Sequence, residues 1–221
     1  AGVGQQIDDP LSFDHAGPSF VEALQGTSMP KRVAFSPDLS IVLMEKEIAK
    51  VCCGAATVFA DLGAEVTDEI PDFSGVLEAF QTLRAVLFAT MMEPILTQHR
   101  DRIAPEIIGN IERGLNITSS QIFDAERARI ELYKNVTAFF ETHDFLICPA
   151  ASIAPFPVDQ RYVTEIDGKP CETYIDWFSI TFALTMTACP TISVPCGFTS
   201  EGLPVGVQIM GKPRGEAALL C

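Results

Sequence analysis

Residues 174–211 constrain the fold more than any other stretch of this chain. They begin with an apolar and aromatic segment, residues 176–186, interrupted mainly by Ser and Thr. Two β-branched runs follow, residues 191–194 and 205–210, and each is bounded by Gly and Pro, as strands commonly are. Residues 195–204 contain Gly, Ser and Pro. The stretch therefore predicts a buried segment followed by two strands that a loop connects.

Residues 33–67 have the pattern of a strand, a helix and a second strand. The first strand is expected at residues 33–36 and the second at residues 64–67. Between them, apolar residues recur at three- and four-residue steps, as in an amphipathic helix, at positions 41, 44, 48, 51, 55, 58 and 62. Gly63 is expected to end this helix in a left-handed conformation. Such a unit predicts two parallel strands with a right-handed crossover.

The remaining elements complete an α/β pattern. A second long helix is expected over residues 73–96, where Pro94 should end or kink it. Residues 118–121 form a capping box before another helix, which should run to about residue 141. Residues 145–148 are fully apolar, as expected at the centre of a sheet, and residues 166–169 fit a hairpin turn. The predicted fold is α/β, with a mixed, twisted sheet flanked by helices on both faces.

Length and composition favour a folded chain that makes one domain or one large part of a domain. The chain has 221 residues, of which 48% are hydrophobic, so it can bury a substantial core. Residues 1–30 are rich in Gly, Pro and Ser and are expected to form a linker or N-terminal extension, with one short helix near residues 19–24. Residues 31–221 are expected to belong to a single α/β domain.

Charge and cysteine content limit the partners and the compartment. The net charge of −14 argues against a nucleic-acid partner. No apolar run reaches the ~20 residues that span a bilayer, so no membrane partner is expected. The chain has an odd number of cysteines, 7, including the adjacent pair Cys52 and Cys53, without the spacing of a disulfide scaffold. This usage favours a reducing, cytoplasmic setting.

Two motifs are weak evidence for a cofactor or a metal. Residues 206–212 superficially match a phosphate-binding loop, but Pro213 stands where the motif needs Ser or Thr, and the residues between the glycines are strand-like. The three histidines are scattered without metal-ligand spacing, at His15, His99 and His143. Neither a nucleotide, nor another cofactor, nor a metal ion is therefore expected.

A nucleophile is also difficult to assign within the chain. Ser193 lies inside an expected strand, without the sharp turn that surrounds an activated serine. Cys189 and Cys196 each flank a proline, and structural burial is the favoured interpretation of both. No catalytic residue is therefore assigned.

Two places could border a substrate. Asp176 and Trp177 precede the apolar segment, where a ring can wall a pocket and a carboxylate can orient polar groups. The alternative is a helix that Asp176 caps, with Trp177 in the core. Residues 148–150 follow the central strand, at the strand end where ligands of α/β proteins commonly bind. A simple strand-to-loop transition is the alternative there.

The final stretch resembles the C-terminal signature of the amidase signature family. Residues 176–177 match its aromatic D-W segment, residues 185–197 its N-L-T-G-x-P-A-I-S-V-P-x-G run, and residues 202–211 its G-L-P-x-G-x-Q-x-x-G strand. Shorter resemblances bring nearly the whole chain into register, at residues 8–12, 31–38 and 144–150. Thr185 replaces the usual Asn, which should alter the substrate-side wall. Ala188 replaces the usual Gly, which suggests that no positive φ is needed there.

The resemblance implies an amidohydrolase that cleaves a carboxylic amide to an acid and ammonia or an amine. In the family, a Ser attacks the amide carbon and an acyl-enzyme forms, a cis-Ser relays the proton, and a Lys is the base, without cofactor or metal. These residues lie in a region N-terminal to the part matched here, and residues 2–4 are too short to serve. Residues 31–221 are thus expected to be the C-terminal part of one amidase-like domain, inactive alone. By resemblance, the substrate-binding candidates are Asp176, Trp177, Thr185 and Cys189.

Two other functions stay open. One is the A subunit of a glutamyl-tRNA amidotransferase, which works with protein partners and tRNA, although the spacing from Asp176 to Pro190 fits stand-alone amidases better. The other is a non-catalytic binding or assembly module that uses the aromatic face. The expected partners are a small-molecule amide, and either a second copy of the chain or the missing N-terminal part.

Overall fold

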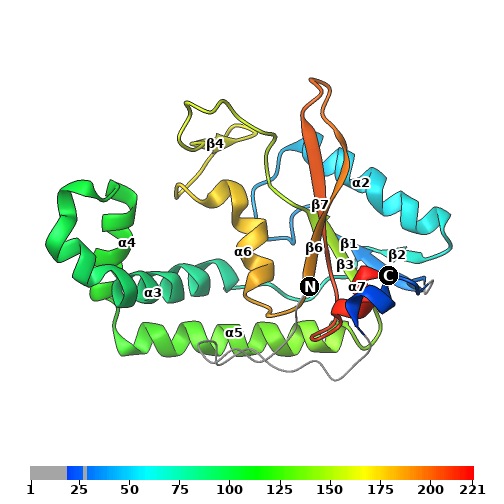
Figure 1. Ribbon diagram of the computed structural model, residues 1–221, viewed down its shortest axis with the longest axis horizontal. Helices are drawn as coiled ribbons and strands as arrows, with labels where there is room; N and C mark the ends of the chain where they lie inside the picture. The colour runs from blue at the N-terminus through cyan, green and yellow to red at the C-terminus, as the bar shows by residue number, and fades with distance from the viewer. Residues whose placement is uncertain (1–18, 27–28) are drawn as a thin grey trace.

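The computed structural model describes residues 19–26 and 29–221 and shows a mixed five-stranded sheet with helices on both faces (Figure 1). The strand order is β2-β1-β3-β7-β6. The first three strands are parallel, and β7 is antiparallel to both β3 and β6. The α/β prediction is therefore confirmed. The strands are β1 (Arg32–Phe35), β2 (Glu65–Thr67), β3 (Phe145–Pro149), β6 (Thr191–Phe198) and β7 (Pro204–Met210).

The helix α2 (Lys46–Asp61) connects β1 to β2, which pair in parallel as predicted. Gly63 follows it with φ of 96°, in the left-handed region, so the predicted helix end is confirmed. The predicted start and buried stripe were partly wrong. The helix begins several residues later, and Val58 and Leu62 are 54% and 57% exposed. Its buried residues are Ile48, Cys52 and Ala56.

Residues 37–42 form bends and turns, and residues 43–45 are irregular, where the first helical turns were predicted. Local side-chain hydrogen bonds hold residues 36–40. The amide of Leu39 donates to the hydroxyl oxygen of Ser36, and the amide of Ser40 donates to the Asp38 carboxylate. Both Leu39 and Ser40 have positive φ, which excludes a right-handed helix there. Short polar side chains compete with a helix in this way.

The last two strands form an antiparallel hairpin whose loop is shorter than predicted. The strand β6 continues through Pro195 to Phe198, with a register shift between Pro195 and Gly197. Pro195 is tolerated because, among the described residues, β6 is an edge strand, and a proline at an edge or a bulge removes no essential ladder bond. At the other side of β7, β3 occupies the centre of the sheet, as predicted.

Side chains alternate between two cores on the two faces of the sheet. On β1, Val33 faces the core beneath α2 and Ala34 faces the core beneath the other helices. On β3, Leu146 faces the same core as Ala34, and Ile147 faces the core beneath α2. Both faces are therefore buried, which explains why the central strand reads as a continuous apolar run.

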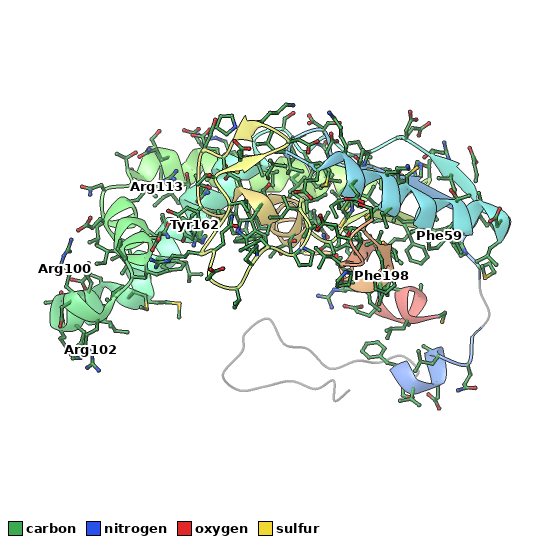
Figure 2. All side chains as sticks on the ribbon, turned by 90° about the horizontal axis from the view of Figure 1, so that it is seen from above. Phe59, Arg100, Arg102, Arg113, Tyr162 and Phe198 are labelled. Atoms are coloured by element: carbon green, nitrogen blue, oxygen red, sulfur yellow. The ribbon has the colours of Figure 1, made fainter. Side chains whose placement is uncertain are left out.

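The long helices contribute Val76, Leu132 and Val136 to the core on the sheet face opposite α2 and extend beyond the sheet (Figure 1). They are α3 (Val76–His99), α4 (Pro105–Leu115) and α5 (Ser119–Phe139), with the short 3-10 helix η1 (Arg100–Arg102) after α3. Pro94, which was predicted to end or kink the helix, lies inside α3 and therefore does not end it. The capping box of Thr118 and Gln121 is confirmed. Figure 2 shows Arg100 and Arg102 at one end of the molecule and Phe59 at the other, with Tyr162 between them.

The remaining elements are short: α1 (Phe20–Ala23), β4 (Glu165–Ile166), β5 (Lys169–Pro170), η2 (Asp176–Phe178), α6 (Ser179–Thr185) and α7 (Glu216–Leu220). A capping box at Ser19 opens α1, which confirms the short helix. Asp167 and Gly168 both have positive φ between β4 and β5, which confirms the hairpin turn. The family-like residues 8–12 lie outside the described residues.

Candidate functional site

Trp177 lies where the end of β3 meets the start of α6. The amide of Ser152 donates to the Trp177 carbonyl at 3.1 Å, and the hydroxyl of Thr181 donates to the Ala150 carbonyl at 2.9 Å. These two bonds tie the loop after the central strand to the aromatic segment. The predicted Asp176–Trp177 site and the predicted strand-end site at residues 148–150 are therefore adjacent in space.

The Trp177 ring packs edge-on between two other rings. Its centroid lies 5.3 Å from that of Phe156 and 4.8 Å from that of Phe178, with interplanar angles of 86° and 73°. Edge-to-face geometry is favourable for aromatic pairs. The indole is only partly buried, so it forms a wall and is not sealed in the core.

Trp177 borders two cavities. The first measures about 200 Å³ and is lined mainly by small and apolar residues at the ends of β3 and β7, among them Ile48, Ala150, Ala151, Phe156 and Gly206. The second measures about 310 Å³ and is more aromatic and polar, with Tyr162, Tyr174, Phe178, Arg161 and Glu106. The ring thus separates an apolar chamber from an aromatic one, and either could hold part of a small molecule.

A polar network that the sequence did not predict holds the aromatic chamber in place. Arg84 of α3 donates to the Asn110 side-chain oxygen at 2.9 Å and to the Tyr174 hydroxyl at 2.5 Å. Asn110 of α4 donates to the same hydroxyl at 2.7 Å. Asn110 is buried, so these bonds satisfy groups that water does not reach. Residues from three separate segments converge here, and no local motif marks such a convergence.

Asp176 uses its carboxylate within its own loop. It accepts hydrogen bonds from the amides of Glu172 and Thr173, at 2.6 Å and 2.9 Å, and from the Thr173 hydroxyl. It does not cap α6, whose N-cap residue is Phe178, so the capping alternative was wrong. Asp176 also lines a cavity of about 560 Å³ beside Ser179 and Phe182. Its predicted contact with substrate stays a prediction.

Thr185 and Cys189 lie apart from Trp177. Thr185 is the last residue of α6 and is exposed, and its hydroxyl donates to the Thr181 carbonyl at 3.2 Å. A seven-residue helix spans about 10 Å, so Thr185 is at the far end from the ring. Cys189 is half-buried beside Thr187, and burial raises the pKa of its thiol. Neither residue lines the two cavities beside Trp177, so their substrate role stays a prediction.

The prediction for the Ala188 backbone was wrong. Ala188 has φ of 57°, in the left-handed region that residues with a Cβ avoid. The amide of the preceding Thr187 donates to the Leu184 carbonyl as the chain leaves α6, and Ala188 then turns the backbone toward β6. The turn therefore needs positive φ, although this chain carries no glycine there.

The remaining candidates from the sequence have ordinary surroundings. Ser193 lies within a strand, β6, as predicted, and its side chain is exposed, whereas Cys196 is half-buried on the same strand. Over residues 19–26 and 29–221, no three His, Cys, Asp or Glu side chains come together as a metal site. Over the same residues, no helix is both long and apolar enough to cross a membrane.

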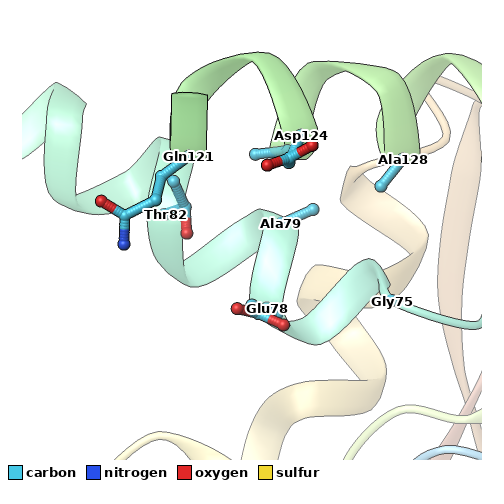
Figure 3. Close-up of a pocket in the computed structure, with 8 residues that line it drawn as sticks. Gly75, Glu78, Ala79, Thr82, Gln121, Asp124 and Ala128 are labelled. Atoms are coloured by element: carbon cyan, nitrogen blue, oxygen red, sulfur yellow. The ribbon is translucent and has the colours of Figure 1, made fainter. Parts of the chain in front are cut away.

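A further cavity lies between two long helices, away from the Trp177 site. It measures about 340 Å³ and is lined from α3 by Glu78, Ala79 and Thr82 and from α5 by Gln121, Asp124 and Ala128 (Figure 3). Small side chains on both helices leave this space open. No aromatic side chain lines it, unlike the chambers beside Trp177.

Solved structures share this fold. A bacterial aryl acylamidase of the amidase signature enzymes superposes with a TM-score of 0.85 over 98% of this chain and 47% of its own, at 23% identity. A 6-aminohexanoate cyclic dimer hydrolase, solved with its substrate, superposes with a TM-score of 0.82 over 98% of this chain and 48% of its own, at 20% identity. This chain is thus an α/β protein that shares the architecture of the matched parts of these hydrolases.

Sequence comparison gives the family. The Amidase family model matches residues 3–220, and the chain belongs to the amidase signature family. An acylamidase of Rhodococcus erythropolis is 30% identical over 99% of this chain and 46% of its own length. The A subunit of the glutamyl-tRNA(Gln) amidotransferase from Alkaliphilus metalliredigens is 24% identical over 87% of this chain and 38% of its own. The chain spans less than half the length of these relatives.

Proposed function

We propose that this chain is the C-terminal part of an acylamidase-like hydrolase that cleaves a carboxylic amide to an acid and ammonia or an amine. The observation that carries the proposal is the Trp177 wall between two cavities, beside the end of β3, in a chain of the amidase signature family. An apolar ring beside a small chamber suits the non-reacting part of an amide.

The catalytic groups in this proposal come from outside these 221 residues. The family's Ser attacks the amide carbon, the amine leaves, and water hydrolyses the acyl-enzyme, while the cis-Ser and Lys transfer protons. This chain contributes part of the sheet and one wall of the substrate cavity. Trp177 contacts the apolar portion of the substrate. Asp176, Thr185 and Cys189 lie outside the two cavities beside Trp177 and are proposed as further contacts in the complete enzyme.

Assays of the isolated chain and of the full-length enzyme test this division of roles. The 221-residue polypeptide should release no ammonia or amine from aryl or aliphatic amides, because it lacks an activated nucleophile and its base. The full-length enzyme should hydrolyse them. Activity in the isolated chain that Ser193→Ala or Cys196→Ala destroys would show that the nucleophile lies within these residues and would overturn the proposal.

A second candidate is the A subunit of a tRNA-dependent amidotransferase. The similarity to such a protein of Alkaliphilus metalliredigens favours it, whereas the higher identity to the acylamidase over nearly the whole chain favours a stand-alone enzyme. Assays of the full-length protein distinguish the two candidate functions by their substrates. A stand-alone enzyme hydrolyses simple amides without other proteins, whereas an A subunit amidates Glu-tRNA(Gln) from glutamine when partner proteins are added. Failure in both assays would favour a non-catalytic binding or assembly module.

A further inference from the structure

Two cysteine thiols from distant parts of the sequence meet where α2 packs on the β6–β7 hairpin. The Sγ atoms of Cys52 and Cys196 lie 3.9 Å apart, although 144 positions separate the residues. The Cys52 thiol also lies 3.7 Å from the Gly206 carbonyl, toward which it can donate. A disulfide bond is about 2.0 Å long, so the two side chains together would have to move by roughly 2 Å.

The backbone of β6 is built to bring this thiol pair together. Pro195 pairs with Gly206 and Gly197 pairs with Val205, which leaves Cys196 as the extra residue of a bulge. Bulges redirect side chains, and this one packs the partly buried Cys196 against the core beneath α2. A Cβ on Gly197 would lie 2.8 Å from a methyl of Val51, so a larger residue there would require the Val51 side chain to shift.

The two thiols differ in exposure. Cys196 is half-buried, whereas Cys52 is 0% exposed. Burial raises the pKa of both thiols, so each is mostly protonated at neutral pH and reacts slowly. An oxidant from solution therefore meets Cys196 first, and Cys52 is placed behind it as a resolving thiol.

We propose that Cys52 and Cys196 form a reversible oxidation site for hydroperoxides. The peroxide transfers one oxygen atom to Cys196 Sγ, which gives a sulfenic acid, and leaves as an alcohol, or as water from hydrogen peroxide. Cys52 Sγ then attacks Cys196 Sγ. The S–S bond forms, the S–O bond breaks, and hydroxide leaves with the Cys52 proton as water. Two equivalents of an external thiol restore both cysteines by exchange through a mixed disulfide and leave as their own disulfide.

The cross-link would act on the candidate site as well as on stability. Ile48 lies one helical turn before Cys52, and both Ile48 and Gly206 line the apolar chamber beside Trp177. Joining α2 to β6 therefore fixes one wall of that chamber. The disulfide would close a loop between residues that are 144 positions apart, which restricts the unfolded chain. We therefore expect Tm to rise by roughly 10 °C.

Peptide mapping after mild oxidation tests the proposal. The purified protein is treated with hydrogen peroxide, unfolded in iodoacetamide, digested and analysed by mass spectrometry. The expected product is one disulfide between Cys52 and Cys196, with a higher Tm that dithiothreitol reverses. Cys53→Ser is the matched control, because Cys53 neighbours Cys52 on α2 but is exposed, and it should behave like the wild type. Cys196→Ser should lose both the disulfide and the rise in Tm.

Three results would overturn the proposal. The first is that Cys52 and Cys196 are both recovered alkylated after a treatment that oxidises exposed Cys53. The second is that the disulfide joins other cysteines, and the third is that Cys196 is converted to a sulfinic acid without a disulfide. If Cys196→Ser fails to fold, the peptide map of the wild-type protein still shows whether the disulfide between Cys52 and Cys196 forms.

Discussion

At the scale of single residues, Trp177 is the side chain on which the proposed site most depends. Its ring is only partly buried and borders two cavities, so Trp177→Ala should weaken binding of an amide by ~1–3 kcal/mol, which is about a 10–200-fold rise in KM. The Tm should change little. The measurement is KM and Tm on the same full-length variant.

The control for Trp177 is a stacked ring outside both chambers. Phe80 stacks on Phe182 with centroids 4.0 Å apart, so Phe80→Ala should lower Tm and leave KM unchanged. If Trp177→Ala instead costs ~3–5 kcal/mol of unfolding free energy with unchanged kinetics in the folded fraction, the residue is part of the core and the site assignment is wrong.

Ala188 offers a stabilising substitution. A left-handed conformation costs a residue with a Cβ ~1–2 kcal/mol, whereas glycine adds ~0.5–1 kcal/mol of unfolded-state entropy. Ala188 is exposed, so Ala188→Gly should raise the free energy of unfolding by roughly 0.5–1 kcal/mol, measured by urea denaturation. Ala138→Gly on the exposed face of α5 should instead lower the free energy of unfolding. A loss of stability at Ala188 would mean that its φ is not strained.

These residues also show how much of the site the sequence can predict. The sequence marked Asp176–Trp177 and the end of the central strand as two separate places. It did not predict that they are adjacent, because contacts between segments distant in sequence leave no local pattern. The Arg84–Asn110–Tyr174 network was missed, because three polar residues far apart in sequence carry no local signal. The backbone at Ala188 was missed because the residue type argued against the geometry that the turn requires.

At the scale of elements, the packing of α4 on α3 depends on one glycine. A Cβ on Gly114 would lie 2.0 Å from the carbonyl oxygen of Ala85, whereas a Cβ on Gly109 of the same helix meets nothing within 4 Å. Gly114→Ala should therefore lower the free energy of unfolding by ~1–3 kcal/mol or more. Gly109→Ala should raise it by about 0.5–1 kcal/mol through helix propensity. Chemical denaturation measures both, and equal effects would mean that the helices are not closely packed.

The first turn of α2 is tied to the β6–β7 loop by a pH-sensitive bond. The Ser200 amide donates to the Glu47 carboxylate at 2.7 Å, which lowers the pKa of that carboxyl. A lowered folded-state pKa gives stability that is present above the unfolded value, about 4.3, and is lost as the pH falls through the folded value. Glu47→Gln should thus lower Tm at pH 7, by an amount that shrinks as the pH falls below about 4. Glu201→Gln on the same loop controls for net charge, and a pH-independent difference would contradict the linkage.

Element types were easier to predict than their boundaries. The βαβ unit, the capping box at Thr118 and the central strand follow from periodicity and turn residues, which act locally. The start of α2 and the length of β6 depend instead on competing side-chain bonds at Ser36 and on the edge position of Pro195. Neither the helix and strand propensities of single residues nor the spacing of apolar residues contains information about such tertiary contacts.

At the scale of the whole molecule, the described surface leaves apolar area uncovered. On α3, Leu87, Met91 and Ile95 recur every four residues and are 54%, 64% and 42% exposed, so they form one stripe along the helix. Among the described residues, β6 also has a free edge. Unpaired edges and exposed apolar stripes promote association. We propose that a second copy of the chain, or another part of a longer protein, covers them.

The isolated chain should therefore self-associate. Sedimentation velocity at tens of micromolar, roughly the range where such species aggregate, should show oligomers that an apolar dye binds. Because the chain carries a net charge of −14, repulsion opposes contact, and added salt should increase the oligomer fraction by screening it. Replacing Leu87 and Met91 by Gln should shift the distribution toward monomer, whereas Val58→Gln on the exposed face of α2 should not. A compact monomer at every salt concentration, without dye binding, would show that neither the stripe nor the edge strand drives association.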